Sequence, residues 1–101
     1  MKLLLFILIV AIFSIKAFAN DKMDLGLEVF NNKAECGMCH ALKAAGSSGD
    51  IGPDLDMLKP QIEQTIYAVT NGIGVMPPWD GILTTEEIKA VAYYVFTSTN
   101  N

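Results

Sequence analysis

The most constraining feature of the sequence is the pentapeptide Cys36-Gly37-Met38-Cys39-His40, which holds both cysteines and the only histidine of the chain. With two residues between the cysteines, one helical turn can present both sulfurs on one side, and the next residue then brings an imidazole beside them. This is the spacing of a c-type haem attachment site, in which the thiols add to vinyl groups and the histidine binds iron. The pentapeptide predicts one covalent haem c, attached through Cys36 and Cys39, with His40 as an iron ligand.

Three other uses of these residues are weighed against haem. A thioredoxin-like redox pair needs a βαβ context, which this sequence lacks. A structural zinc site would need a fourth ligand from a carboxylate or from another chain. A plain disulfide with an incidental histidine is the third alternative in an exported protein.

The first nineteen residues resemble a secretory signal. Lys2 is followed by an apolar run from Leu3 to Phe13, and the segment closes on Ala17-Phe18-Ala19. We expect residues 1–19 to be cleaved and the protein to be exported to the periplasm. The run is shorter than the ~20 residues of a spanning helix, so no membrane span is expected in the mature form, with an uncleaved anchor as the alternative.

The remaining residues, 20–101, suffice for one small domain. A core of this size usually needs a cofactor, metal or disulfide to complete it. Residues 20–101 hold five lysines, no arginine and eleven acids, a net charge of −6. This charge argues against nucleic acid as a partner and favours basic patches on other proteins, unless it reflects only a solvated surface.

The apolar periodicity predicts an all-α domain in which helices alternate with loops. The expected helices cover residues 22–32 and 60–70, with Pro60 in the first turn of the second. Thr84 and Glu87 form the capping box of a last helix, whose apolar residues recur at helical spacing. Residues 45–59 and 74–81 read as loops because they are rich in Gly, Pro and Asp, and no run alternates as a strand.

A second axial ligand cannot be histidine from the same chain, because His40 is the only one. Methionine is the usual alternative in electron-transfer cytochromes. Met76 is favoured because a glycine-containing approach, Asn71 to Val75, and the rigid pair Pro77-Pro78 flank it. The other candidates in residues 20–101 are Met23, Met38 and Met57.

The sequence resembles the class I monohaem cytochromes c over nearly all of residues 20–101. The resemblance rests on Gly26 and Phe30, on the Cys36 to His40 pentapeptide, on Gly52-Pro53-Asp54-Leu55, on residues 71–77 and on the aromatic pair Tyr93-Tyr94. It implies the small cytochrome c fold, with the first and last helices crossing and Gly26 lying beneath Tyr93 or Tyr94. It also implies that the Pro53 carbonyl accepts a hydrogen bond from His40.

The same resemblance implies an electron carrier with His40 and Met76 on the iron, and not an enzyme. Residues 42–46, 52–56, 68–72 and 75–79 are similar to bacterial cytochromes that accept electrons from sulfite dehydrogenase, so the expected partners are such a dehydrogenase and a terminal oxidase. The lysine ring of mitochondrial members is largely absent. Two other functions stay open at this point, a haem subunit of a larger dehydrogenase complex and a gas-binding or catalytic haem protein with an open sixth position.

Overall fold

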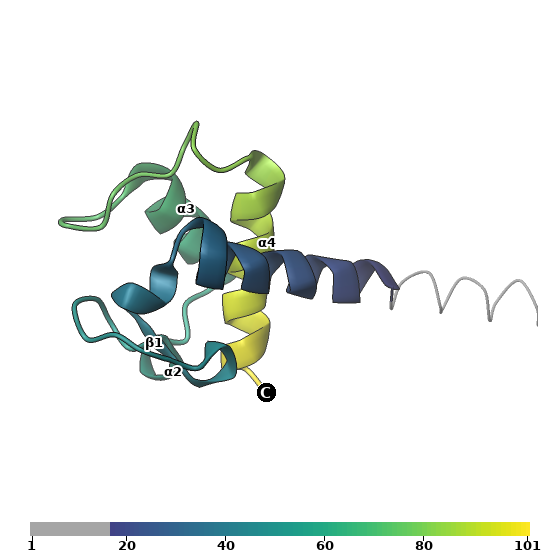
Figure 1. Ribbon diagram of the computed structural model, residues 1–101, viewed down its shortest axis with the longest axis horizontal. Coiled ribbons are helices and arrows are strands. Elements are labelled where there is room, and N and C mark those ends of the chain that lie inside the picture. The colour runs from purple at the N-terminus through teal and green to yellow at the C-terminus, as the bar shows by residue number, and fades with distance from the viewer. Residues whose placement is uncertain (1–16) are drawn as a thin grey trace, which may run out of the picture.

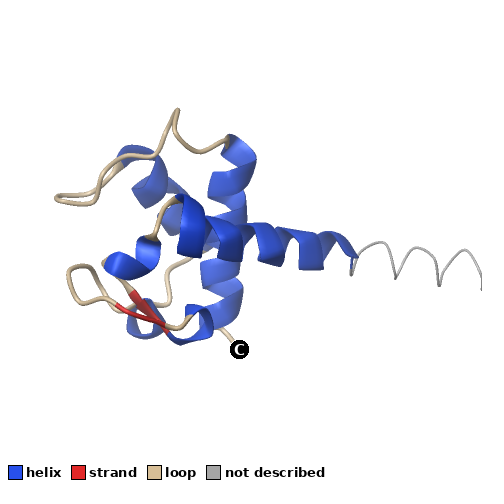
Figure 2. Cartoon of the chain, viewed as in Figure 1, coloured by secondary structure: helices blue, strands red, loops and turns tan. Residues whose placement is uncertain are grey.

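The structure is a computed structural model that describes residues 17–101 (Figure 1). Residues 17–28 are α-helical and continue directly into a π-helical turn, η1 (Val29–Lys33). Figure 2 shows that helices dominate and that the only sheet in this part of the chain is a short hairpin. The elements that follow are η2 (Cys36–Met38), β1 (Ala41–Leu42), η3 (Lys43–Ala45), β2 (Ser47–Ser48), α2 (Leu55–Leu58), α3 (Ile62–Asn71) and α4 (Thr85–Thr99).

The last helix, α4, forms the centre of the core. Its predicted capping box is confirmed, because the Thr84 amide donates to Glu87 Oε1 at 2.9 Å and the Glu87 amide donates to Thr84 Oγ1 at 3.1 Å. These two bonds satisfy backbone groups that a helix start otherwise leaves unpaired. The buried apolar residues of α4 recur along its length and are Ile88, Ala90, Val91, Ala92, Tyr94 and Val95.

The first helix crosses α4 (Figure 1), and Gly26 lies at the crossing. A Cβ atom added at Gly26 would lie 2.5 Å from Tyr94 Cβ and even closer to the Ala90 carbonyl oxygen. Only glycine therefore permits this approach. The expected contact is confirmed for Tyr94, which also packs against Phe30 with ring centroids 6.1 Å apart. The Tyr93 ring instead lies beneath the Lys22 ammonium, and the Lys22 Nζ atom is 5.1 Å from the ring centroid.

The turn η1 joins the first helix to the pentapeptide Cys36 to His40, which is predicted to attach the haem. Its hydrogen bond spans five residues, from the Ala34 amide to the Val29 carbonyl at 2.8 Å, and Val29 and Phe30 are fully buried. Lys33, at the end of η1, forms an ion pair of 2.5 Å with Glu87 at the start of α4. This pair and the buried residues fix the end of η1 against the last helix.

The all-α prediction holds for the architecture, but several boundaries differ. The first helix already includes residue 17, and α3 begins at Ile62, because Gln61 acts as the N-cap and leaves Pro60 outside the helix. The predicted loop 45–59 contains β2 and also α2, which is capped by the Asp54 carboxylate. The four-residue α2 is too short for apolar periodicity to reveal.

Most of the predicted signal peptide lies outside the described residues, and its cleavage after Ala19 stays a prediction. None of the helices within residues 17–101 is long and apolar enough to cross a membrane.

Candidate haem site

A cavity of about 480 Å³ lies between residues 36–40, which we call the attachment turn, the loop after them, α3 and α4. Its walls are mainly apolar, and the polar side chains on them are few, chiefly Glu35, Gln64 and Thr65. Cys36, Cys39, His40, Pro53 and Met76, the five residues predicted to form the site, all line this one cavity. A large apolar cavity with a few ligand side chains is the environment that a flat macrocycle requires.

The attachment turn presents the two cysteines as expected. Residues Cys36–Met38 form a 3₁₀ turn, and the Cys36 carbonyl accepts hydrogen bonds from the Cys39 amide at 3.2 Å and from the His40 amide at 2.9 Å. The preceding Glu35 adopts a left-handed conformation (φ 48°), which turns the chain sharply out of η1. Strain of this kind concentrates at functional sites.

The chemistry of the two thiols does not match the alternative uses. The cysteines are not joined by a disulfide. Burial raises the pKa of the Cys36 thiol to about 11, whereas redox-active Cys-x-x-Cys pairs depend on a lowered pKa. Within residues 17–101 no group of three or more His, Cys, Asp or Glu side chains is arranged to bind a metal ion, so these residues alone do not form the ligand set of a structural zinc site.

His40 is oriented by the loop that follows the attachment turn. Its Nδ1 lies 2.7 Å from the Pro53 carbonyl oxygen. A carbonyl can only accept, so Nδ1 carries the proton, and Nε2 is left with a free lone pair for iron. The expected bond to Pro53 is thus present in the structure.

Gly52 lies directly against the His40 ring, and this role was not foreseen from the sequence. A Cβ atom at Gly52 would lie 2.6 Å from His40 Cε1. The Gly52 amide also donates to the Cys39 carbonyl at 2.7 Å, so the loop is fixed to the attachment turn itself. The only sequence signal for this contact was the neighbouring pair Gly52-Pro53.

Met76 lies on a tight loop that the end of α3 holds in place. Its amide and carbonyl pair with Ile73 at 2.9 and 3.1 Å, and the Trp79 amide donates to the Val69 carbonyl at 2.8 Å. Gly72 has φ 73°, and a Cβ atom there would lie 2.6 Å from the Met76 carbonyl oxygen. The geometry of the loop therefore depends on glycine, as the sequence suggested.

The other three methionines of residues 20–101 are placed differently. Met23 packs against the core from the first helix, and Met57 is 82% exposed and does not line the cavity. Met38 lines the cavity but belongs to the attachment turn and is 70% exposed. Met76 is the half-buried methionine that reaches the cavity from a different part of the chain than His40.

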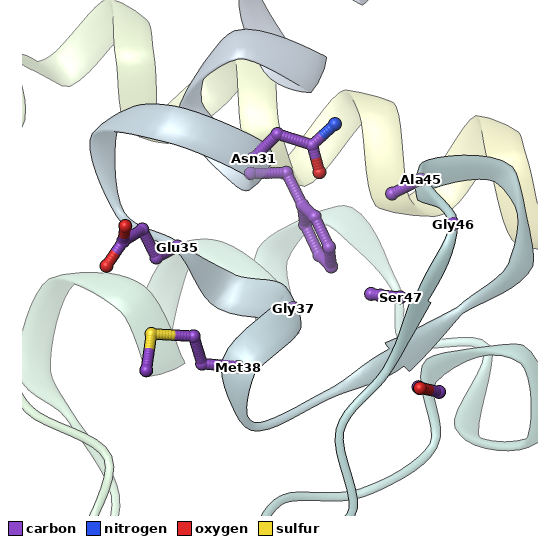
Figure 3. A pocket seen from close by; sticks show the side chains of 9 residues that line it. Asn31, Glu35, Gly37, Met38, Ala45, Gly46 and Ser47 are labelled. Carbon is purple, nitrogen blue, oxygen red and sulfur yellow. The ribbon is translucent and has the colours of Figure 1, made fainter.

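A second hollow of about 380 Å³ lies beside the attachment turn (Figure 3). Its lining includes Asn31, Gly37 and Ser47. It does not include the two cysteines, His40 or Met76. In Figure 3 the Glu35 and Met38 side chains extend away from Ser47. The second hollow is therefore not the place for a haem.

Comparisons with known proteins agree with this geometry. Residues 21–95 match the family model described as cytochrome C oxidase, cbb3-type, subunit III. The chain is 37% identical to cytochrome c6 of Tetradesmus obliquus, over 72% of this chain and 89% of the relative. It is 38% identical to cytochrome c6 of Chlorolobion braunii, over 73% of this chain and 88% of the relative.

A solved structure shares the fold as well as the sequence. The c-type cytochrome SorU from Sinorhizobium meliloti is 51% identical and superposes with a TM-score of 0.75, over 79% of this chain and 93% of that one. The cavity, the attachment turn and these matches lead to one conclusion: the chain belongs to the class I monohaem c-type cytochromes, which are electron carriers with a covalently bound haem c and not enzymes.

Proposed function

We propose that His40 and Met76 would bind the haem iron, and that thioether bonds to Cys36 and Cys39 would attach the macrocycle. The observation that carries the proposal is that all four residues line one apolar cavity, with His40 in the tautomer that leaves Nε2 free. The bound haem supplies a one-electron iron couple, and a saturated iron leaves no position for substrate.

The protein's own residues would keep that couple in an apolar environment. Leu55, Val69, Val91 and Val95 are buried residues on the cavity wall, and Trp79 packs beside them. Such a wall excludes water and disfavours the additional charge of the ferric state, which raises the reduction potential. The soft thioether of Met76 acts in the same direction.

For the partners we propose a periplasmic sulfite dehydrogenase as electron donor and a terminal oxidase as acceptor. Support comes from the sequence segments 42–46, 52–56, 68–72 and 75–79 and from the export signal predicted over residues 1–19. The net charge of −6 in residues 20–101 favours a donor whose docking face is basic. Electron transfer from such a donor should slow as salt rises, because screening weakens the attraction. Stopped-flow reduction by a purified sulfite dehydrogenase measures this, and a rate independent of salt would contradict charge-assisted docking.

The ligand assignment is tested by Met76→Ala, with Met57→Ala as the matched control on an exposed methionine. Optical spectra and the reduction potential of both holoproteins are measured, and the reduced forms are exposed to carbon monoxide. We expect Met76→Ala to lose the methionine–iron absorption, to fall in potential and to bind carbon monoxide, while Met57→Ala behaves as wild type. Unchanged coordination in Met76→Ala would refute the assignment. Rapid, stoichiometric carbon monoxide binding by the reduced wild type would refute a saturated iron.

A further inference from the structure

The short hairpin beside the attachment turn contacts the backbone of the proposed iron ligand. Strand β2 pairs antiparallel with β1, so that Ser47 is opposite Leu42 and Ser48 is opposite Ala41. From this position the Ser47 hydroxyl donates to the His40 carbonyl at 2.9 Å, and it lies 3.4 Å from the Leu42 carbonyl. The residue before β1 is thus bonded to a side chain of β2.

The contact between the hairpin and the attachment turn is too close for side chains in between. A Cβ atom at Gly37 would lie 2.6 Å from Ser47 Cβ, and Figure 3 shows Ser47 pointing toward Gly37. A Cβ atom at Gly49 would lie 2.7 Å from the Cys39 carbonyl carbon and 2.8 Å from the Gly37 oxygen. Segment 47–49 therefore lies directly on the backbone of the turn.

The same segment continues to the residues that orient the His40 ring. Five residues after Ser47 and Ser48, the chain reaches Gly52, which lies against the His40 ring near Cε1, and Pro53, whose carbonyl contacts Nδ1. His40 is consequently held at its main chain and at its ring by one short stretch, residues 47–53. Because both the main chain and the ring of His40 are held, the ring has little freedom to rotate.

We propose that Ser47 is a positioning residue that sets the orientation of the His40 imidazole by holding the His40 carbonyl. The inference rests on the proposed ligation of iron by His40. Ser47 is not one of the proposed iron ligands, and it acts only through its hydrogen bond to the His40 carbonyl. Loss of its hydroxyl leaves a partly buried carbonyl without this donor and frees the ring to turn about its bond to Pro53.

The test compares Ser47→Ala with Ser48→Ala in the ferric holoprotein. Ser47→Ala removes the hydroxyl but keeps the Cβ atom that packs against Gly37, and Ser48→Ala removes an exposed hydroxyl from the same strand. The readouts are the haem-methyl proton shifts, which report the orientation of the axial imidazole plane, and the urea midpoint. We expect Ser47→Ala to redistribute the methyl shifts and Ser48→Ala to reproduce the wild-type pattern.

A lower urea midpoint for Ser47→Ala with an unchanged methyl pattern would overturn the proposal, because Ser47 would then be a structural brace only. If Ser47→Ala does not accumulate as holoprotein, hydroxyl-proton exchange in the wild type decides. Slow exchange of the Ser47 hydroxyl supports the bond to His40, and exchange as fast as that of exposed Ser48 overturns it. Absence of histidine–iron signals in the wild-type spectra would instead refute the ligation by His40, so the two failures are distinguishable.

Discussion

The replacement of Gly26 by alanine tests the helix crossing on which the fold depends. The new Cβ atom would lie 2.5 Å from Tyr94 Cβ and 3.0 Å from the Ala90 carbonyl carbon, whereas carbon atoms in contact prefer about 3.5–4.0 Å. These partners are backbone and Cβ atoms, so no change of rotamer removes the clash. The two helices would have to separate by about 1 Å.

Such overpacking costs about 1–3 kcal/mol, and this site belongs at the upper end because Phe30 and Tyr94 would be loosened as well. The better helix propensity of alanine returns about 1 kcal/mol. We therefore expect a net loss of about 2 kcal/mol in the free energy of unfolding. For a domain of this size that corresponds to a fall of roughly 8–16 °C in Tm.

Urea and thermal unfolding of the holoprotein, followed by circular dichroism and by haem absorption, measure this loss. Asp24→Ala, at an exposed position of the same helix, is the control and should stay within about 0.5 kcal/mol of wild type. A Gly26→Ala protein as stable as wild type, or more stable, would refute the close crossing of the first helix and α4.

Two further substitutions test the site and the ion pair. Gly52→Ala would place a Cβ atom 2.6 Å from His40 Cε1, so we expect a large loss of holoprotein in the haem spectrum. The control is Gly46→Ala, whose Cβ atom would have nothing within 4 Å. This variant should lose only about 1–2 kcal/mol of stability, because of its left-handed φ, and should keep its haem. Holoprotein of normal yield and spectrum from Gly52→Ala would contradict the contact. The hydrogen bond from Lys33, followed by the bonds from Thr84, lowers the pKa of Glu87 in the folded protein. The ionised carboxylate therefore stabilises the fold at neutral pH. This stabilisation is lost as the pH falls from about 4.3, the unfolded pKa, to the lowered folded pKa. Glu87→Gln keeps an acceptor for the capping box but removes the charge, and it should flatten the decline of the urea midpoint in that acid range; an unchanged decline would argue against the ion pair.

The sequence predicted best those features that are encoded locally. The capping box of α4 needs only Thr84 and Glu87, three residues apart, and the turn that aligns Cys36 with Cys39 follows from their spacing. Because the chain has one histidine, methionine was the expected second ligand, and Met76 does line the cavity that also holds His40.

Features that depend on distant residues could not be read in the same way. The strands β1 and β2 have two residues each, too few for an alternating pattern, so neither the hairpin nor the bond from Ser47 to His40 was visible. The ion pair between Lys33 and Glu87 joins residues 54 positions apart. The predicted start of α3 at Pro60 was wrong, because proline is also compatible with the position before an N-cap, and Gln61 is the N-cap.

The π-helical turn η1 has a consequence for how this chain tolerates insertions and deletions. A hydrogen bond that closes over five residues accommodates one residue more than an α-helical turn, and one residue corresponds to about 100° of helical rotation. The extra residue separates two requirements, the seating of Val29 and Phe30 in the core and the direction in which the chain enters the attachment turn. Deleting one residue from η1 would restore a regular helix and keep the sequence of the pentapeptide, yet it would turn the cysteines away from the cavity. The register of the first helix at η1, and not only the Cys-x-x-Cys-His motif, therefore determines whether a haem can be attached.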